Sequence, residues 1–105
     1  MKRKTPRKHK NPRIYERLAE ANPQALTADG FEDAFIGILY RFSNDGLACY
    51  DRDKCIDVLM KRDGMSLDDA EEFFSFNTIG AWVGEGTPCF LERCEPDLRK
   101  TRKTR

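Results

Sequence analysis

The sequence predicts an α+β fold: a small three-stranded antiparallel sheet with two helices packed on one face, in the order β-β-α-α-β, flanked by disordered basic tails. Three features predict it. An apolar segment over residues 34–42 precedes Asp45-Gly46, a strong hairpin signal because glycine tolerates positive φ. Asp51 and Ser66 each stand as N-cap residues before amphipathic stretches. Lysine and arginine are concentrated at both ends of the chain, and such runs are usually solvated.

A short helix is the first element expected after the Lys/Arg/Pro-rich start of the chain. Asn11 would cap this helix, and Pro12 would take its first position, where the missing N–H of proline does no harm. Pro23 would end the helix, and residues 22–30 are expected to form a loop.

The next two elements are expected to be strands. Residues 34–42 are rich in aromatic and branched side chains and apolar on both faces, which predicts a central strand. Residues 47–50 would form the strand that returns after the hairpin.

Two helices are expected after the hairpin. The first would begin at its N-cap Asp51, run to Arg62 and end at Gly64, since glycine adopts the left-handed conformation of a C-cap. Its inward side would carry Cys55, Ile56, Leu59 and Met60. The second would begin at its N-cap Ser66 and fade around Gly80. Its inward side would carry Leu67, Ala70, Phe73, Phe74 and Asn77.

A third strand over residues 87–92 would complete the sheet, and 105 residues are enough for one domain at most. We expect a basic disordered arm over residues 1–13, a single α+β domain over 14–97 and a basic disordered tail over 98–105. No apolar run approaches a membrane span, and the basic start is not followed by the apolar core of a secretory signal. A soluble intracellular protein is therefore expected.

Four cysteines occur, at Cys49, Cys55, Cys89 and Cys94. Nothing in the sequence indicates an oxidising compartment, so reduced thiols are expected. Their spacing does not match a zinc site, and the only histidine lies in the basic arm. The expected domain therefore offers no Ser/His or Cys/His pair. We expect no metal, no cofactor, no catalytic residues and no enzyme.

Charge is sorted along the chain. Residues 1–13 carry seven Lys/Arg and residues 98–105 carry five, without an acid in either segment, which gives +12. All 18 acids lie between Glu16 and Asp97 with only seven bases, which gives −11. Basic runs of this kind are common nucleic-acid arms, without base-specific readout. The residues expected to bind nucleic acid are Lys2, Arg3, Lys4, Arg7, Lys8, Lys10, Arg13, Arg99, Lys100, Arg102, Lys103 and Arg105. Alternatively, the arms aid solubility or screen the acidic body.

An alternative interface is acidic. The side chains that would face a basic partner are Asp51, Asp53, Asp57, Asp68, Asp69, Glu71 and Glu72. Most of them are also explained by helix capping and by the helix dipole, which favours acids in a first turn. Asp51, Asp53 and Asp57 could also be interpreted as a Mg²⁺ site, but helix capping and the helix dipole explain their positions better.

A weaker candidate is a ligand site at Trp82, Gly84, Glu85 and Gly86. Glycine lets a backbone approach a ligand closely, and Trp82 could stack on a ring. The simpler interpretation is a tight turn with Trp82 in the core, because the glycine spacing matches no phosphate-binding motif.

Residues within Tyr50–Glu92 carry a resemblance: Tyr50-Asp51, Lys54, Asp63-Gly64-Met65, the Glu-rich helix before Phe76-Asn77, and Gly84-Glu85 with Thr87-Pro88. With the preceding hairpin, this segment (about residues 34–92) resembles a family of small uncharacterised proteins of tailed bacteriophages and prophages. The resemblance implies expression in the cytoplasm of an infected bacterium and no particular activity. Phage proteins of this size are commonly host-takeover or anti-defence factors that act by binding.

The function expected is therefore that of a phage-encoded, non-enzymatic accessory protein. It would bind DNA or RNA through its basic tails and a bacterial host protein or defence complex through its acidic body. The alternative is an anti-defence inhibitor, anti-CRISPR-like or a DNA mimic, that acts by protein–protein binding. A weaker alternative is sequestration of a small ligand or nucleotide at the Gly84–Gly86 turn. No membrane partner is expected.

Overall fold

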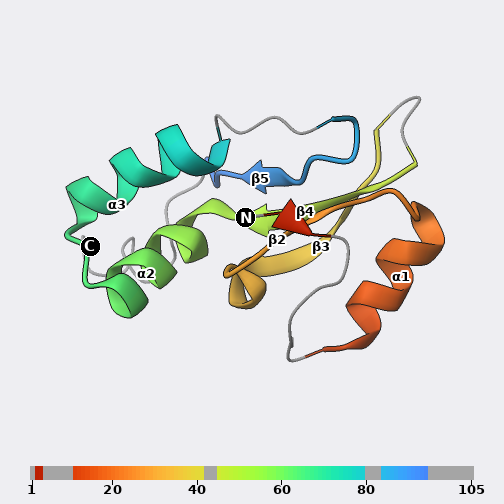
Figure 1. The fold of residues 1–105 in the computed structure, drawn as a ribbon, viewed down its shortest axis with the longest axis horizontal. Helices are drawn as coiled ribbons and strands as arrows, with labels where there is room; N and C mark the ends of the chain where they lie inside the picture. The colour runs from red at the N-terminus through yellow and green to blue at the C-terminus, as the bar shows by residue number, and fades with distance from the viewer. Residues whose placement is uncertain (1, 4–10, 42–44, 80–83, 95–105) are drawn as a thin grey trace.

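The computed structural model describes residues 2–3, 11–41, 45–79 and 84–94 of the chain. They form a mixed α and β fold in which three α-helices accompany a three-stranded and a two-stranded sheet (Figure 1). The elements in chain order are β1 (Lys2–Arg3), α1 (Arg13–Ala21), β2 (Thr27–Ala28), the 3₁₀ turn η1 (Glu32–Ala34), β3 (Phe35–Leu39), β4 (Leu47–Asp51), α2 (Arg52–Asp63), α3 (Leu67–Phe74), the π turn η2 (Ser75–Ile79) and β5 (Cys89–Leu91).

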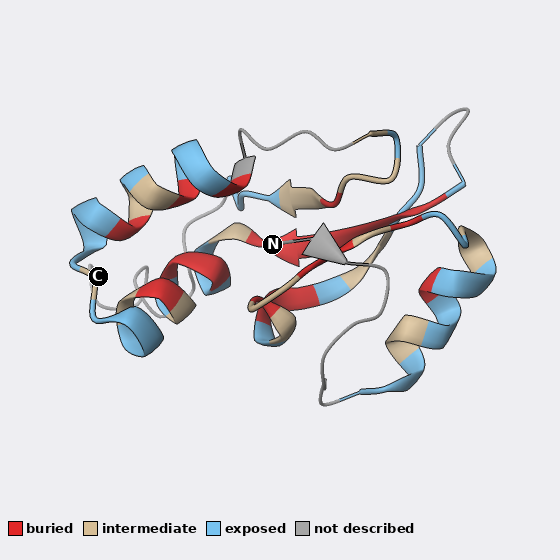
Figure 2. Ribbon diagram, viewed as in Figure 1, coloured by how far each residue is buried: buried red, intermediate tan, exposed pale blue. Residues whose placement is uncertain are grey.

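The predicted hairpin is confirmed, but the positions of its strands differ from the prediction. β3 and β4 pair antiparallel with Leu39 opposite Leu47. In the three-stranded sheet the order is β3-β4-β5, so β4 is central and β3 lies at an edge. Figure 2 shows β4 buried along its length. β3 ends at Leu39 and is interrupted by a bulge between Phe35 and Gly37, a common feature of edge strands.

The third strand is parallel to β4, and not antiparallel as predicted. Cys49, Tyr50 and Asp51 of β4 lie opposite Cys89, Phe90 and Leu91 of β5. Figure 1 shows the reason: α2 runs on past the end of β4, α3 turns back, and β5 is entered from the end where β4 begins. Parallel neighbours require such a crossover, and here α2 and α3 lie within it. The two helices therefore extend beyond the end of the sheet more than they cover one face.

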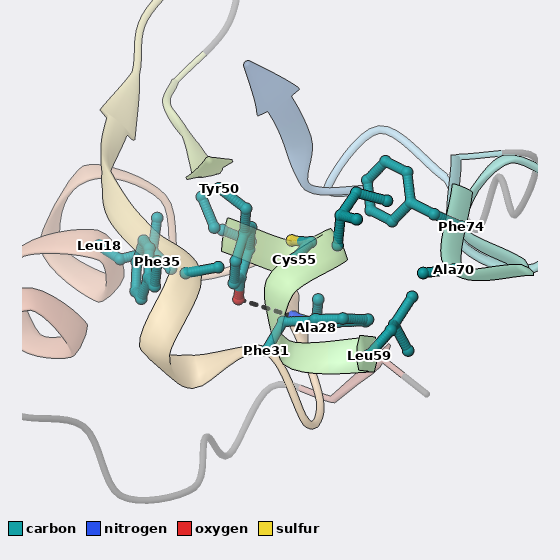
Figure 3. Close-up of a cluster of buried hydrophobic side chains, with 13 residues drawn as sticks. Leu18, Ala28, Phe31, Phe35, Tyr50, Cys55, Leu59, Ala70 and Phe74 are labelled. Atoms are coloured by element: carbon teal, nitrogen blue, oxygen red, sulfur yellow. Dashed lines mark hydrogen bonds between the residues drawn. The ribbon is translucent and has the colours of Figure 1, made fainter. Parts of the chain in front are cut away.

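One core joins the helices to the sheet (Figure 3). The ring of Tyr50 stacks on Phe35 with 5.1 Å between centroids, and lies 5.6 Å from Phe90. Phe74 of α3 meets Phe90 edge to face at 5.2 Å. The backbone N–H of Ala28 donates a buried hydrogen bond of 2.7 Å to the Tyr50 hydroxyl. Tyr50 therefore connects β4 both to the core and to β2.

The helix ends follow the predicted local rules. Asp51 and Ser66 are the N-caps of α2 and α3, and their side chains accept hydrogen bonds from backbone N–H groups of the first turn. Gly64 is the left-handed C-cap of α2. At α1 the N-cap position belongs to Pro12, although the Asn11 side chain does accept from the Arg13 N–H at 3.2 Å.

The inward side of α3 is only partly as predicted. Ala70 and Phe74 are buried and Phe73 is partly buried, but Leu67 and Asn77 are exposed. Asn77 lies in η2, where the turn widens to a π-type turn and changes the direction of each side chain.

Two predicted irregular regions contain strand residues. Thr27 and Ala28, in the expected loop, are buried and form β2, while Lys2 and Arg3, in the expected disordered arm, form β1 against it. A pair of two-residue strands needs only backbone hydrogen bonds, so no periodic pattern of side chains predicts it from the sequence. Arg13, the last residue of the expected arm, begins α1.

Candidate functional site

The predicted nucleic-acid contacts fall in two groups. Lys2 and Arg3 lie in β1, and Arg13 is the exposed first residue of α1. The remaining members lie outside the described residues: Lys4, Arg7, Lys8, Lys10, Arg99, Lys100, Arg102, Lys103 and Arg105.

A groove of about 550 Å³ lies beside Arg13, between α1 and β3. Its lining residues are Asn11, Arg13, Ile14, Glu16, Arg17, Glu20, Gly37, Ile38 and Tyr40. Arg13 and Arg17 are one helical turn apart, so both residues lie on the groove side of α1. Across the groove, Tyr40 is 62% exposed. An exposed ring beside two arginines can stack on a base while the arginines meet phosphates.

Sequence reasoning missed Arg17 and Tyr40. The i, i+4 spacing of Arg13 and Arg17 on an expected helix was a usable signal. Tyr40 carried none, because its place in an apolar segment predicted burial. Glu16 and Glu20 also line the groove and offset the two positive charges. These acids oppose a polyanion in the groove, so the groove can only add to binding by the basic ends of the chain.

Asp51 is part of the scaffold and does not belong to an exposed acidic surface. Its side chain is buried, and it accepts from the N–H groups of Asp53 at 2.9 Å and Lys54 at 3.4 Å. Arg93 donates to its other oxygen at 2.8 Å. Burial alone would raise the pKa of the Asp51 carboxyl, but the hydrogen bonds from Arg93, Lys54 and Asp53 and the charge of Arg93 together lower this pKa below its usual value.

The other acids of α2 are largely matched by bases. Asp57 pairs with Lys61 at 3.1 Å. The guanidinium of Arg52 lies 3.4 Å from both Asp53 and Glu71. It also lies 3.9 Å from Glu92. Arg52 therefore joins α2, α3 and the end of β5, and it reduces the negative charge that a partner would meet there.

Among the acids predicted to face a basic partner, those without a basic partner in the described part of the chain lie on α3. Asp68, Asp69 and Glu72 are exposed and make no ion pair with another described residue. Their spacing places them on one side of the helix. Phe76 lies in η2, two residues beyond the end of α3, and is 75% exposed. We call these four residues the α3 surface. Exposed aromatic rings are enriched at protein contacts, and the rims of such contacts are polar.

The Gly84–Gly86 turn has a structural explanation. Gly84 has φ of 112°, and its carbonyl accepts from the Thr87 hydroxyl at 2.6 Å. Gly86 leaves no space for a side chain, since a Cβ there would collide with the Gln24 carbonyl oxygen. Its own carbonyl accepts from the Leu26 N–H at 3.0 Å. Gly84 thus serves the conformation of the turn, and Gly86 serves close packing against residues 24–25. Glu85 is exposed, and Trp82 lies outside the described residues.

No metal centre is evident within the described segments, where no three His, Cys, Asp or Glu side chains gather closely enough to hold an ion. Among the same residues, every helix is too short or too polar to cross a membrane.

Comparisons with known proteins add no further constraint. No family model matches the chain, and neither curated proteins nor solved structures include a match. The resemblance to the phage family therefore stays a prediction.

Proposed function

We propose that this chain is a non-enzymatic binding protein that holds nucleic acid through its Lys/Arg-rich ends and a bacterial host protein through the α3 surface. The observation that carries this proposal is the sorting of charge: twelve of the 19 Lys/Arg lie in residues 1–13 and 98–105, away from every acid. A phage setting follows from the resemblance alone and is part of the proposal.

The groove beside α1 supports the nucleic-acid half. It opens next to the basic N-terminal segment, since Asn11 and Arg13 line it. A strand held by the basic segment could continue along Arg13 and Arg17 and place one base on Tyr40. Stacking on an exposed ring favours single strands, whose bases are free to turn outward.

The α3 surface supports the protein half, and also a second candidate function. An inhibitor that presents Asp68, Asp69 and Glu72 to a basic site on a defence complex would act as a nucleic-acid mimic or as an anti-CRISPR-like factor. In that case the basic ends would be incidental to its activity.

Capture from bacterial lysate with and without nuclease separates the two functions. We expect the native chain to retain many nucleic-acid-bound proteins that nuclease removes, plus one nuclease-resistant partner. Replacing Asp68, Asp69 and Glu72 by lysine should remove only the resistant partner. If that partner is the only protein retained before nuclease treatment, the chain is an inhibitor. If nothing is retained, both functions are excluded.

The groove makes a narrower prediction. Tyr40→Ala should weaken binding of a single-stranded oligonucleotide by about tenfold, in line with about 1–3 kcal/mol per stacked base, and leave duplex binding nearly unchanged. Fluorescence anisotropy of both labelled oligonucleotides measures this. Phe76→Ala is the matched control, since it removes an exposed ring elsewhere and should leave both affinities unchanged. Equal affinities of the native and Tyr40→Ala chains would exclude the groove while leaving the basic ends as the interface.

A further inference from the structure

We propose that Cys49 and Cys89 form an oxidation-sensitive pair that closes into a disulfide between β4 and β5 when the protein meets a peroxide. Both cysteines are reduced in this structure. The proposal is independent of the nucleic-acid and protein surfaces described above.

The register of the sheet carries this proposal. Cys49 and Cys89 are direct partners across β4 and β5. Neighbouring strands lie about 4.7–4.9 Å apart, and disulfides join residues whose Cα atoms are about 4.4–6.8 Å apart. Directly paired side chains leave the sheet on the same face. The next pair along the ladder, Tyr50 and Phe90, already touches across the strands, with 5.6 Å between ring centroids.

The local environments assign a role to each thiol. Cys89 is partly exposed, whereas Cys49 is 9% exposed. Burial raises the pKa of the Cys49 thiol, and the nearby Cys89 and Asp51 raise it further. Peroxide therefore meets Cys89 first, and Cys49 acts as the second thiol.

Formation of the disulfide consumes one peroxide molecule for each chain and releases two water molecules. The Cys89 sulfur attacks one peroxide oxygen, the O–O bond breaks, and one water leaves after proton transfer, so that Cys89 becomes a sulfenic acid. The Cys49 sulfur then attacks the Cys89 sulfur, the S–O bond breaks, and the hydroxyl leaves as a second water with the Cys49 proton. Two electrons pass from the two sulfurs to the peroxide.

The position of β5 makes the bond reversible. Neighbouring strands lie about 4.7–4.9 Å apart, whereas a disulfide needs Cβ atoms about 3.5–4.5 Å apart. β5 must therefore move towards β4 by about 1 Å. β5 is a three-residue strand at the sheet edge, so this movement is local. Bonds closed under strain are the easily reduced, regulatory kind.

The other two cysteines differ from this pair in their exposure to solvent. Cys55 is fully buried in the core, and burial raises its pKa to about 12. Cys94 is exposed, three residues beyond β5. Cys94 is the one that could divert the reaction, by joining two chains or by pairing with Cys89, so it is replaced by serine in the test.

The experiment treats the full-length Cys94→Ser chain with hydrogen peroxide and maps its peptides by mass spectrometry without reduction. We expect a loss of two hydrogen atoms per chain, one peptide pair joined through Cys49 and Cys89, and full reversal by dithiothreitol. The matched control Cys55→Ala in the same background should form the same bond. Cys89→Ser, a change at a partly exposed position, should not form it.

Three results would overturn the proposal. Cys89 could be oxidised to sulfinic acid without any linkage. The linkage could join two chains. The bond could also form equally in chains unfolded by urea, which would show that the register of the sheet does not direct it.

Discussion

Replacing all twelve Lys/Arg of residues 1–13 and 98–105 by glutamine should weaken nucleic-acid binding by roughly a thousandfold or more at about 50 mM salt. Electrostatic contact with phosphates supplies essentially all of non-specific binding. For the native chain on a duplex, each neutralised phosphate contributes about 0.9 to the slope of log affinity against log salt. The variant should lose most of this slope, which anisotropy measured across a salt series reports.

The control for this variant is a chain with Lys54→Gln and Lys61→Gln, two exposed lysines of α2. It carries the same type of change on the acidic body, and its affinity should stay within a few-fold of the native value. A native slope near zero, or a neutralised variant that binds as tightly as the native chain, would contradict the nucleic-acid half of the proposed function.

Replacing Asp51 by alanine should lower the free energy of unfolding by about 2 kcal/mol at pH 7. Loss of an N-cap side chain costs about 1 kcal/mol. Loss of the hydrogen-bonded pair with Arg93 adds about 1 kcal/mol, a modest figure because the Arg93 side chain is 56% exposed. Urea unfolding followed by circular dichroism measures the difference. Asp53→Ala is the control: its side chain is 60% exposed, and it should cost less than about 0.5 kcal/mol.

The pH dependence of this difference identifies the carboxylate as its cause. The folded pKa of Asp51 is lower than its unfolded value, which is about 3.9. Its stabilisation is therefore present above about pH 4 and is lost as the pH falls through the lower folded pKa. The gap between the native and Asp51→Ala chains should shrink over that acid range. A gap that is unchanged there would indicate lost packing instead of lost charge interactions.

Local rules predicted the parts of this fold that depend on neighbours in the chain. Asp51, Ser66 and Gly64 mark helix ends through contacts within about four residues, so their sequence context was sufficient. The hairpin at Asp45-Gly46 is equally local. The direction of β5 is different, because it depends on the path of α2 and α3 in space, and no pattern within residues 87–92 encodes that path.

The candidate sites also combine features that local sequence predicts with features that depend on the path of the chain in space. The sorting of charge is visible in the sequence, whereas the groove exists only because α1 lies beside β3. The sequence alone identified the three acids of the α3 surface. A count of charges, however, could not separate the buried Asp51 from the exposed Asp68. That distinction required Arg93, which lies 42 residues further along the chain.

The crossover between β4 and β5 also orders the events of folding. Closing the hairpin spans residues 40–46, whereas placing β5 beside β4 spans residues 52–88. The longer closure costs about 1.5 kcal/mol more chain entropy. The β3–β4 hairpin therefore costs less chain entropy to form first. β5 is expected to pair with β4 after α2 and α3 have formed and brought residues 51 and 89 closer together. In the reverse direction, opening of β5 alone would expose the Cys89 thiol to solvent while the β3–β4 hairpin stays paired.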